Sequence, residues 1–171
     1  PYDERPPVFV KSTPVPNATG VTKNKIEIEF DELIQLEKVS EKVIVSPPQK
    51  NMAEITASGR RVLITLRDTL LPNTTYTIDF SDAIVDNNEK NAIPGFSYAF
   101  TTGDHIDSLQ VSGLVLNAAD LEPVTGMLVG LHSQLDDSTF RMMPLERIAT
   151  TDAYGRFSIK NVSPGSYRIY A

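Results

Sequence analysis

Three segments of the sequence carry large apolar side chains at every second position, and this alternation most constrains the fold. In "KIEIEF" (residues 25–30) two isoleucines and a phenylalanine fall on one side and charged residues on the other. The same period recurs in "TYTIDF" (75–80) and "FSYAF" (96–100). Successive side chains of a β-strand point to opposite faces, so a period of two predicts strands that lay one face on a core.

Shorter apolar runs separated by turn residues fill the rest of the first hundred residues. The further candidate strands there are "VFVKSTP" (8–14), "KVIVSP" (42–47), "AEITAS" (53–58) and "RVLITLRD" (61–68). "DELIQLEKV" (31–39) spaces its apolar residues by three and also permits a helical turn. Seven short strands in about a hundred residues are typical of an aligned β-sandwich.

A polar stretch, "TGDHIDS" (102–108), divides the chain, and a second β pattern follows it. The sequence therefore predicts two domains, residues 1–103 and 104–171, in an all-β chain. Strand candidates in the second domain are "LQVSGLVLN" (109–117), "GMLVGLHSQ" (126–134), "RIATT" (147–151), "RFSIKN" (156–161) and "SYRIYA" (166–171).

The first domain resembles the bacterial Ig-like domains of the S-layer type, most closely those of surface lipoproteins in Bacteroides-like bacteria. Six residues in "LPNTTYTIDFSDAIVDNNEKN" carry this likeness: Leu71, Pro72, Thr74, Tyr76, Asp86 and Asn91. The resemblance implies an Ig-like β-sandwich. At Lys90 the family usually has glycine, so the resemblance predicts a turn that is either strained or differently shaped.

The second domain resembles the carboxypeptidase-regulatory-like family, a non-catalytic β-sandwich related to transthyretin. The matching segments are "VSGLVLN" (111–117), "TTDAYGRFSI" (150–159) and "VSPGSYRIYA" (162–171). In the middle segment we expect Asp152 to satisfy turn amides, Gly155 to take a positive φ, and Phe157 and Ile159 to face inward. The resemblance implies further strands beyond Ala171, so we expect this domain to be C-terminally truncated.

Composition excludes several classes of function. The net charge of −6 argues against nucleic acid or an anionic membrane surface as a partner, because both require a basic face. The absence of cysteine excludes disulfides and thiol catalysis. No apolar run reaches the length of a membrane span. The chain begins at Pro1 without Met, so we expect a fragment of a longer protein, with membrane attachment only through a lipid anchor outside it.

The acidic segment "DAIVDNNEKN" (82–91) is the strongest candidate for a metal site. Asp82, Asp86 and Asn88 are weak calcium candidates, because Ca²⁺ binds several oxygens from one loop. The segment lacks the glycine and terminal glutamate of the EF-hand pattern. The alternative, that Asp86 and Asn91 organise a turn, is favoured, and no metal or other cofactor is expected.

Catalytic and ligand-contact candidates are few. The only histidines are His105 and His132, and no nucleophile-elbow motif accompanies them, so we expect no enzyme activity. Tyr154, at a predicted hairpin tip, is a candidate ligand contact, against the alternative that it packs on its own hairpin. Met142 and Met143 lie in an excursion that we interpret as an insertion between strands.

These observations favour a non-enzymatic structural, adhesive or spacer protein of the bacterial cell envelope, built of Ig-like modules within a larger surface lipoprotein. It would act at the outer-membrane surface or in the periplasm, with a protein or glycan partner. One alternative is a glycan-binding accessory module of a surface polysaccharide-uptake system. Another is the non-catalytic scaffold of a larger enzyme.

Overall fold

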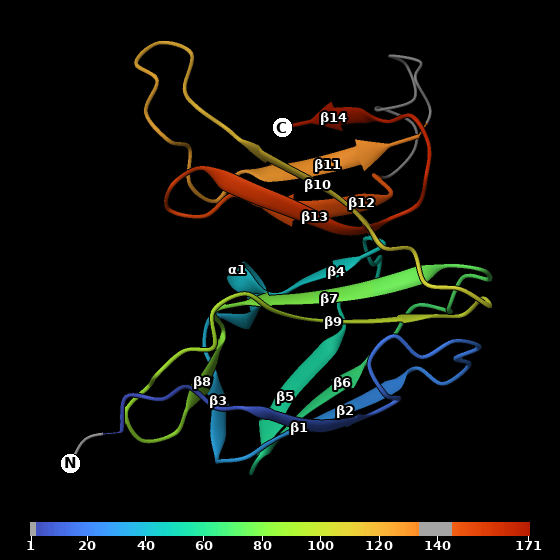
Figure 1. The fold of residues 1–171 in the computed structure, drawn as a ribbon, viewed down its shortest axis with the longest axis vertical. Coiled ribbons are helices and arrows are strands. Elements are labelled where there is room, and N and C mark those ends of the chain that lie inside the picture. Colours follow the sequence, from blue (N-terminus) through green and yellow to red (C-terminus); the bar gives the residue numbers. More distant parts are fainter. Residues whose placement is uncertain (1–2, 134–144) are drawn as a thin grey trace. The chain divides into compact units, whose positions relative to one another are not determined.

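The structure, a computed structural model of the chain, describes residues 3–133 and 145–171, which separate into two compact units (Figure 1). The first unit contains residues 1–43 and 49–106, and the second contains residues 44–48 and 107–171. Their regular secondary structure is almost entirely β-strand, which confirms the predicted all-β class. The predicted insertion around Met142 and Met143 lies outside the described residues.

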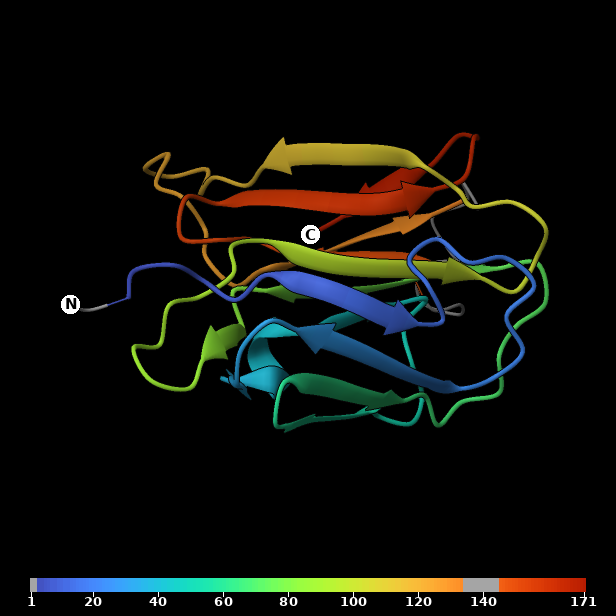
Figure 2. The ribbon, with the colours of Figure 1, turned by 60° about the horizontal axis from the view of Figure 1, so that its bottom comes forward.

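One antiparallel sheet of the first unit has four strands, in the order β1-β2-β6-β5. Their bounds are β1 Phe9–Thr13, β2 Lys25–Phe30, β5 Glu54–Ser58 and β6 Arg61–Thr65. Figure 2 shows β1 and β2 running side by side. Gly59, at a φ of 61°, and Arg60 connect β5 to β6, as their place between two apolar runs predicts.

The other strands of the first unit form two further pairings. β7 (Thr75–Ser81) pairs antiparallel with β9 (Phe96–Thr101), and β3 (Ile34–Leu36) pairs antiparallel with β8 (Ile84–Asp86). The ambiguous segment 31–39 is resolved as β3, after which the four-residue helix α1 (Val39–Lys42) begins. β8 lies inside the acidic segment, where the sequence predicts only a crossover and a turn.

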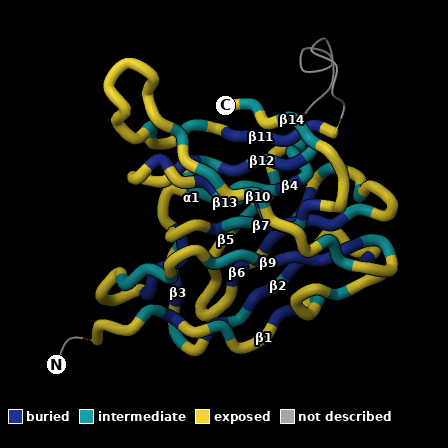
Figure 3. Tube along the Cα trace, turned by 45° about the horizontal axis from the view of Figure 1, so that its top comes forward, coloured by how far each residue is buried: buried dark blue, intermediate teal, exposed yellow. Residues whose placement is uncertain are grey.

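The alternating residues form the core of the first unit, as predicted. Ile28, Phe30 and Phe80 are fully buried, and the rings of Tyr76 and Phe100 stack with centroids 5.2 Å apart. Figure 3 shows the buried strand positions in dark blue and the exposed loops in yellow.

One prediction about β7 is wrong: its second face is not exposed to solvent. Thr75 and Thr77 are buried as well as the alternate residues of this strand. Threonine gives no signal here, because its methyl group suits a buried face and its hydroxyl an exposed one. The sequence alone therefore does not distinguish a one-sided from a two-sided strand.

The second unit contains two small antiparallel sheets, β10-β13 and β12-β11-β14. The strands of these two sheets are β10 Leu109–Leu114, β11 Leu128–His132, β12 Arg147–Thr150, β13 Arg156–Val162 and β14 Arg168–Tyr170. The short strand β4 (Ile44–Ser46) also belongs to this unit but to neither sheet. Val129, Leu131 and Ile159 pack in its core. Gly113 leaves room for Phe157, since a Cβ there would lie 2.7 Å from the ring.

Candidate functional site

The carboxylate of Asp86 organises the turn that follows β8. Asp86 is 1% exposed, and its Oδ1 accepts hydrogen bonds from the backbone amides of Asn88 (2.8 Å), Glu89 (2.6 Å) and Lys90 (3.2 Å). Its Oδ2 accepts the amide of Asn91 at 2.6 Å. Both oxygens are therefore bonded to backbone amides within the turn, which is the arrangement expected of a turn-organising aspartate.

Electrostatics at Asp86 follow from these bonds. Burial alone would raise the pKa of this carboxyl, but the amide donors, Asn91 first, outweigh burial and lower the pKa below its usual range. Nearby, burial and then the negative charges of Asp86 and Asp31 raise the pKa of Glu32. The acidic surroundings therefore help to raise the pKa of Glu32, while the amide donors of the turn favour the ionised form of Asp86.

Lys90 adopts the left-handed conformation at which the family usually places glycine. Its φ is 65°, so the turn keeps the shape that the family pattern predicts, with a lysine at the strained position. A non-glycine residue in this region costs about 1 kcal/mol. The Lys90 ammonium contacts the side chain of Gln35 on β3, and the Gln35 amide donates to Asn87 Oδ1 at 2.5 Å.

The structure does not gather the calcium candidates into one site. Asp82 lies before β8 and forms a 2.8 Å ion pair with Lys42, while Asn88 gives its backbone amide to Asp86. Asp79 accepts the amide of Ser81. Within residues 3–133 and 145–171, no group of three or more histidine, cysteine, aspartate or glutamate side chains is placed to hold a metal ion.

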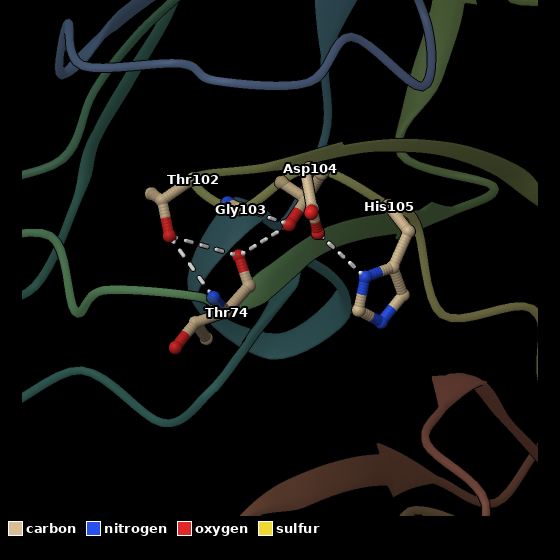
Figure 4. A network of polar contacts seen from close by, with 6 residues as sticks. Thr74, Thr102, Gly103, Asp104 and His105 are labelled. Carbon is tan, nitrogen blue, oxygen red and sulfur yellow. Dashed lines mark hydrogen bonds and ion pairs between the residues drawn. The ribbon is translucent and has the colours of Figure 1, made fainter.

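A second polar network fixes the end of the first unit, and neither of its threonines stood out as a functional residue in the sequence. The Thr102 hydroxyl donates to the Leu71 carbonyl at 2.7 Å. It accepts the Thr74 amide at 3.0 Å (Figure 4). The Gly20 amide donates to the Gly103 carbonyl at 2.8 Å. His105 follows, exposed, with its Nδ1 2.9 Å from the Asp104 carboxylate. Hydrogen bonding from His105 lowers the pKa of Asp104.

Asp68 organises the loop at Lys50 and Asn51, which sequence reasoning missed. Its carboxylate accepts the backbone amides of Lys50 (2.6 Å) and Asn51 (2.9 Å) and the side-chain amide of Asn51 (2.8 Å). The backbone bonds from Asn51 and Lys50 lower the pKa of Asp68. These partners lie 17 and 18 residues away in sequence, so no local motif reveals them.

The second histidine, His132, is buried at the end of β11. Its Nδ1 lies 3.7 Å from Glu146 Oε1, and the same oxygen accepts the Ser133 backbone amide at 3.1 Å. The Ser133 hydroxyl also bonds to Glu146 rather than to the imidazole. A serine nucleophile needs its hydroxyl on the histidine, with the carboxylate on the other ring nitrogen. This cluster therefore lacks the geometry of a catalytic triad.

A buried arginine lies in the second unit. Arg147 on β12 is 8% exposed, and its Nε donates to the Lys160 carbonyl at 3.1 Å. Burial lowers the pKa of Arg147 to about 10, although Asp107 and Tyr167 act in the opposite direction. The guanidinium thus stays charged at neutral pH and ties β12 to β13.

The turn between β12 and β13 has the predicted local geometry, but it does not close a hairpin, because β12 pairs with β11 and β13 pairs with β10. Asp152 Oδ1 accepts the amides of Tyr154 (2.8 Å) and Arg156 (2.9 Å), and Gly155 has a φ of 73°. Phe157 is buried, as expected. Tyr154 is 68% exposed, and the Arg156 guanidinium lies 5.6 Å from the centroid of its ring. Tyr154 therefore contacts Arg156 at the end of its own turn and still exposes most of its surface.

A family model for the bacterial Ig-like domain matches residues 3–102. The chain belongs to this family. The Ig-like domain thus includes the Asp86 turn and ends within the Thr102 network. Membership of this family indicates an extracellular or envelope protein. No helix among the described residues is long and apolar enough to cross a membrane.

Three solved structures are similar to the chain at low identity. PcoC, a methionine-rich copper resistance protein from Escherichia coli, is 22% identical over 56% of this chain and 96% of that chain, with a TM-score of 0.41. The N-terminal part of the bacterial S-layer protein SbsC is 12% identical over 96% of this chain and 43% of that chain, with a TM-score of 0.36. An L,D-transpeptidase from Mycobacterium smegmatis is 11% identical over 95% of this chain and 79% of that chain, with a TM-score of 0.38. These scores carry no functional comparison. No curated protein matches the sequence.

Proposed function

We propose that this chain is a non-enzymatic structural module of a bacterial cell-envelope protein, in which the Ig-like domain spaces or presents neighbouring parts of a surface lipoprotein. The observation that carries the proposal is how the acidic side chains at the turns are used. Asp86, Asp68 and Asp152 each bind backbone amides of their own turn or of a neighbouring loop. Such carboxylates stabilise the domain.

The polar groups of the first unit support the same function. Glu27 pairs with Arg61 across β2 and β6, and Lys11 pairs with Glu29 across β1 and β2. These pairs lie on the solvent side of a regular sheet, where ion pairs keep a face soluble and contribute little to stability. A surface of this kind suits a spacer.

For the second unit we propose a carboxypeptidase-regulatory-like sandwich. The turn at Asp152 and Gly155, with Phe157 turned inward, supports this assignment. The proposed boundary lies at 103/104, because Gly103 is still bonded to Gly20 of the first unit. Limited proteolysis should then cut after Gly103, between Asp104 and Ser108, and leave an intact Ig-like fragment; cleavage inside residues 3–102 would contradict the boundary.

The function itself is tested by a domain exchange in the natural protein on its own cells. Residues 3–102 are replaced by an unrelated Ig-like domain of similar length, and surface display is measured by protease accessibility of intact cells. A spacer tolerates the exchange, so display should be unchanged, whereas deletion of the same residues should alter it. Loss of display with the exchanged domain would contradict a spacer role. Turnover of an envelope substrate by the purified chain would contradict a non-enzymatic one.

A further inference from the structure

The outer face of the β10-β13 sheet carries a group of polar side chains that the structural role does not use. The register places Ser112 opposite Ser158 and Leu114 opposite Arg156. The Gln110 side-chain amide donates to the Ser112 hydroxyl at 2.9 Å, which in turn lies 3.5 Å from the Ser158 hydroxyl. Gln110, Ser112, Leu114 and Arg156 are exposed. This set, with Tyr154 in the turn that precedes β13, is termed the β10-β13 face.

Tyr154 provides an aromatic surface at one end of this face. Among the described residues, Tyr154 is the single aromatic side chain in the group of exposed large hydrophobic ones. The Arg156 guanidinium lies over the ring at 5.6 Å from its centroid, within the range of a cation–π contact, and Tyr154 remains 68% exposed. An ordered, exposed ring offers an apolar surface for little loss of side-chain entropy.

The charge of this face is opposite to that of the whole chain. β10 ("LQVSGL") and β13 ("RFSIKNV") contain no acidic residue, and β13 contributes Arg156 and Lys160. The net charge of the chain is −6, so a basic strand pair is a local departure. A guanidinium with exposed N–H groups matches the planar geometry of a carboxylate or the oxygens of a sulfate.

We propose that the β10-β13 face binds an acidic saccharide. The Tyr154 ring packs against the C–H face of one sugar, Arg156 binds the carboxylate or sulfate of the same or the adjacent sugar, and Gln110 and Ser112 bond to sugar hydroxyls. Peptides bind through strand edges, grooves or pockets, whereas these groups lie on an open sheet face. This site goes beyond the proposed structural role and does not depend on it.

The test is isothermal titration calorimetry of the full chain with hexagalacturonate. Maltohexaose is the neutral control, a sulfated galactan hexamer tests sulfate, and hexaglutamate tests an acidic peptide. Saturable binding of hexagalacturonate or the sulfated hexamer is expected, without binding of maltohexaose or hexaglutamate. Binding of only the sulfated hexamer assigns the site to sulfate sugars. Failure of both acidic saccharides to bind, or equal binding of either control, overturns the proposal.

Substitutions locate the site. Tyr154→Ala and Arg156→Gln should each weaken binding by about tenfold, because each removes a contact of the order of 1 kcal/mol or more. Leu128→Ala, in the other sheet, and Arg67→Gln, whose guanidinium pairs with Glu54, are matched controls that should leave the affinity unchanged. Tyr154 and Arg156 are exposed, so both variants should keep the wild-type melting temperature. Unchanged affinity in either variant overturns the proposal.

Discussion

Asp86 and Asp152 each organise a turn, and the two turns differ in how the left-handed residue is accommodated. The turn after β8 has lysine at a φ of 65° and uses four backbone amide bonds to Asp86. The turn between β12 and β13 has glycine at a φ of 73° and two amide bonds to Asp152. The strained turn therefore has the more heavily bonded carboxylate.

The comparison shows that a carboxylate can hold a backbone conformation that the residue itself disfavours. At the turn between β12 and β13, glycine is required by space as well as by φ, because a Cβ on Gly155 would lie 2.5 Å from the Val115 carbonyl oxygen. At Lys90 the side chain extends to Gln35 on a neighbouring strand. The contact with Gln35 and the amide bonds to Asp86 thus offset the backbone strain at Lys90, whereas a residue with a Cβ does not fit at position 155.

The largest expected effect is that of Asp86→Ala. Four amides lose a charged acceptor and the strained Lys90 loses its restraint, so the free energy of unfolding of the Ig-like domain should fall by about 3 kcal/mol. Asp152→Ala should destabilise the second unit less, because only two amides lose their acceptor. Urea denaturation followed by amide signals of each unit measures both changes. Equal losses in the two variants would break the comparison.

Gly155→Ala is the next largest. The left-handed φ and the contact with the Val115 carbonyl together should lower the stability of the second unit by about 2 kcal/mol. Gly59→Ala is the matched control: Gly59 has a φ of 61° but no atom within 4 Å of its Cβ position, so only backbone strain remains. Similar shifts of the denaturation midpoint for the two variants would show that the contact between a Cβ at position 155 and the Val115 carbonyl does not add to the backbone strain.

Lys90→Gly should stabilise the Ig-like domain. Relief of the left-handed strain is offset in part by the greater freedom of glycine in the unfolded chain, so a gain of about 0.5–1 kcal/mol is expected. Lys90→Ala keeps the strain and removes only the contact with Gln35, so it should give no gain. Thermal melting distinguishes the two variants, and a destabilised Lys90→Gly would mean that the lysine contact outweighs the strain.

The pH dependence of folding stability should be a smaller effect than these substitutions, and the carboxyls of Asp86 and Glu32 should contribute to it with opposite signs. The lowered pKa of Asp86 means that its contribution is complete above the unfolded value of about 3.9 and is lost as pH falls through the folded pKa. The stability difference between wild type and Asp86→Asn should therefore narrow below about pH 4.

Glu32 serves as the contrasting case. Its pKa is raised, so on acidification Glu32 is protonated at a higher pH in the folded state than in the unfolded state, and the charged form destabilises the fold. Glu32→Gln should thus be slightly more stable than wild type near neutral pH, and this gain should vanish in acid. Denaturation midpoints across pH 2–7 measure both trends, and parallel profiles for the two variants would contradict the opposite signs.

The sequence predicts the strands that have one face on the core, but not the pairings that depend on distant residues. Alternation predicts β2 and the apolar face of β7, and local turn chemistry predicts the Asp152 turn. The three-residue strands β3 and β8 are too short to show a period. Asp68 and Thr102 bind partners far away in sequence, so their functions appear only when the chain is folded. Lys90 could be identified as an anomaly, whereas its Gln35 contact could not.

The most direct test of the account is the melting temperature of the full chain in calcium and in chelator. Both oxygens of Asp86 are bonded to turn amides, so the account predicts the same midpoint for wild type in millimolar CaCl₂ and in excess EGTA. Asp86→Ala should melt at a lower temperature and be equally insensitive to calcium. A midpoint that rises with calcium in wild type and not in Asp86→Ala would contradict a purely structural turn.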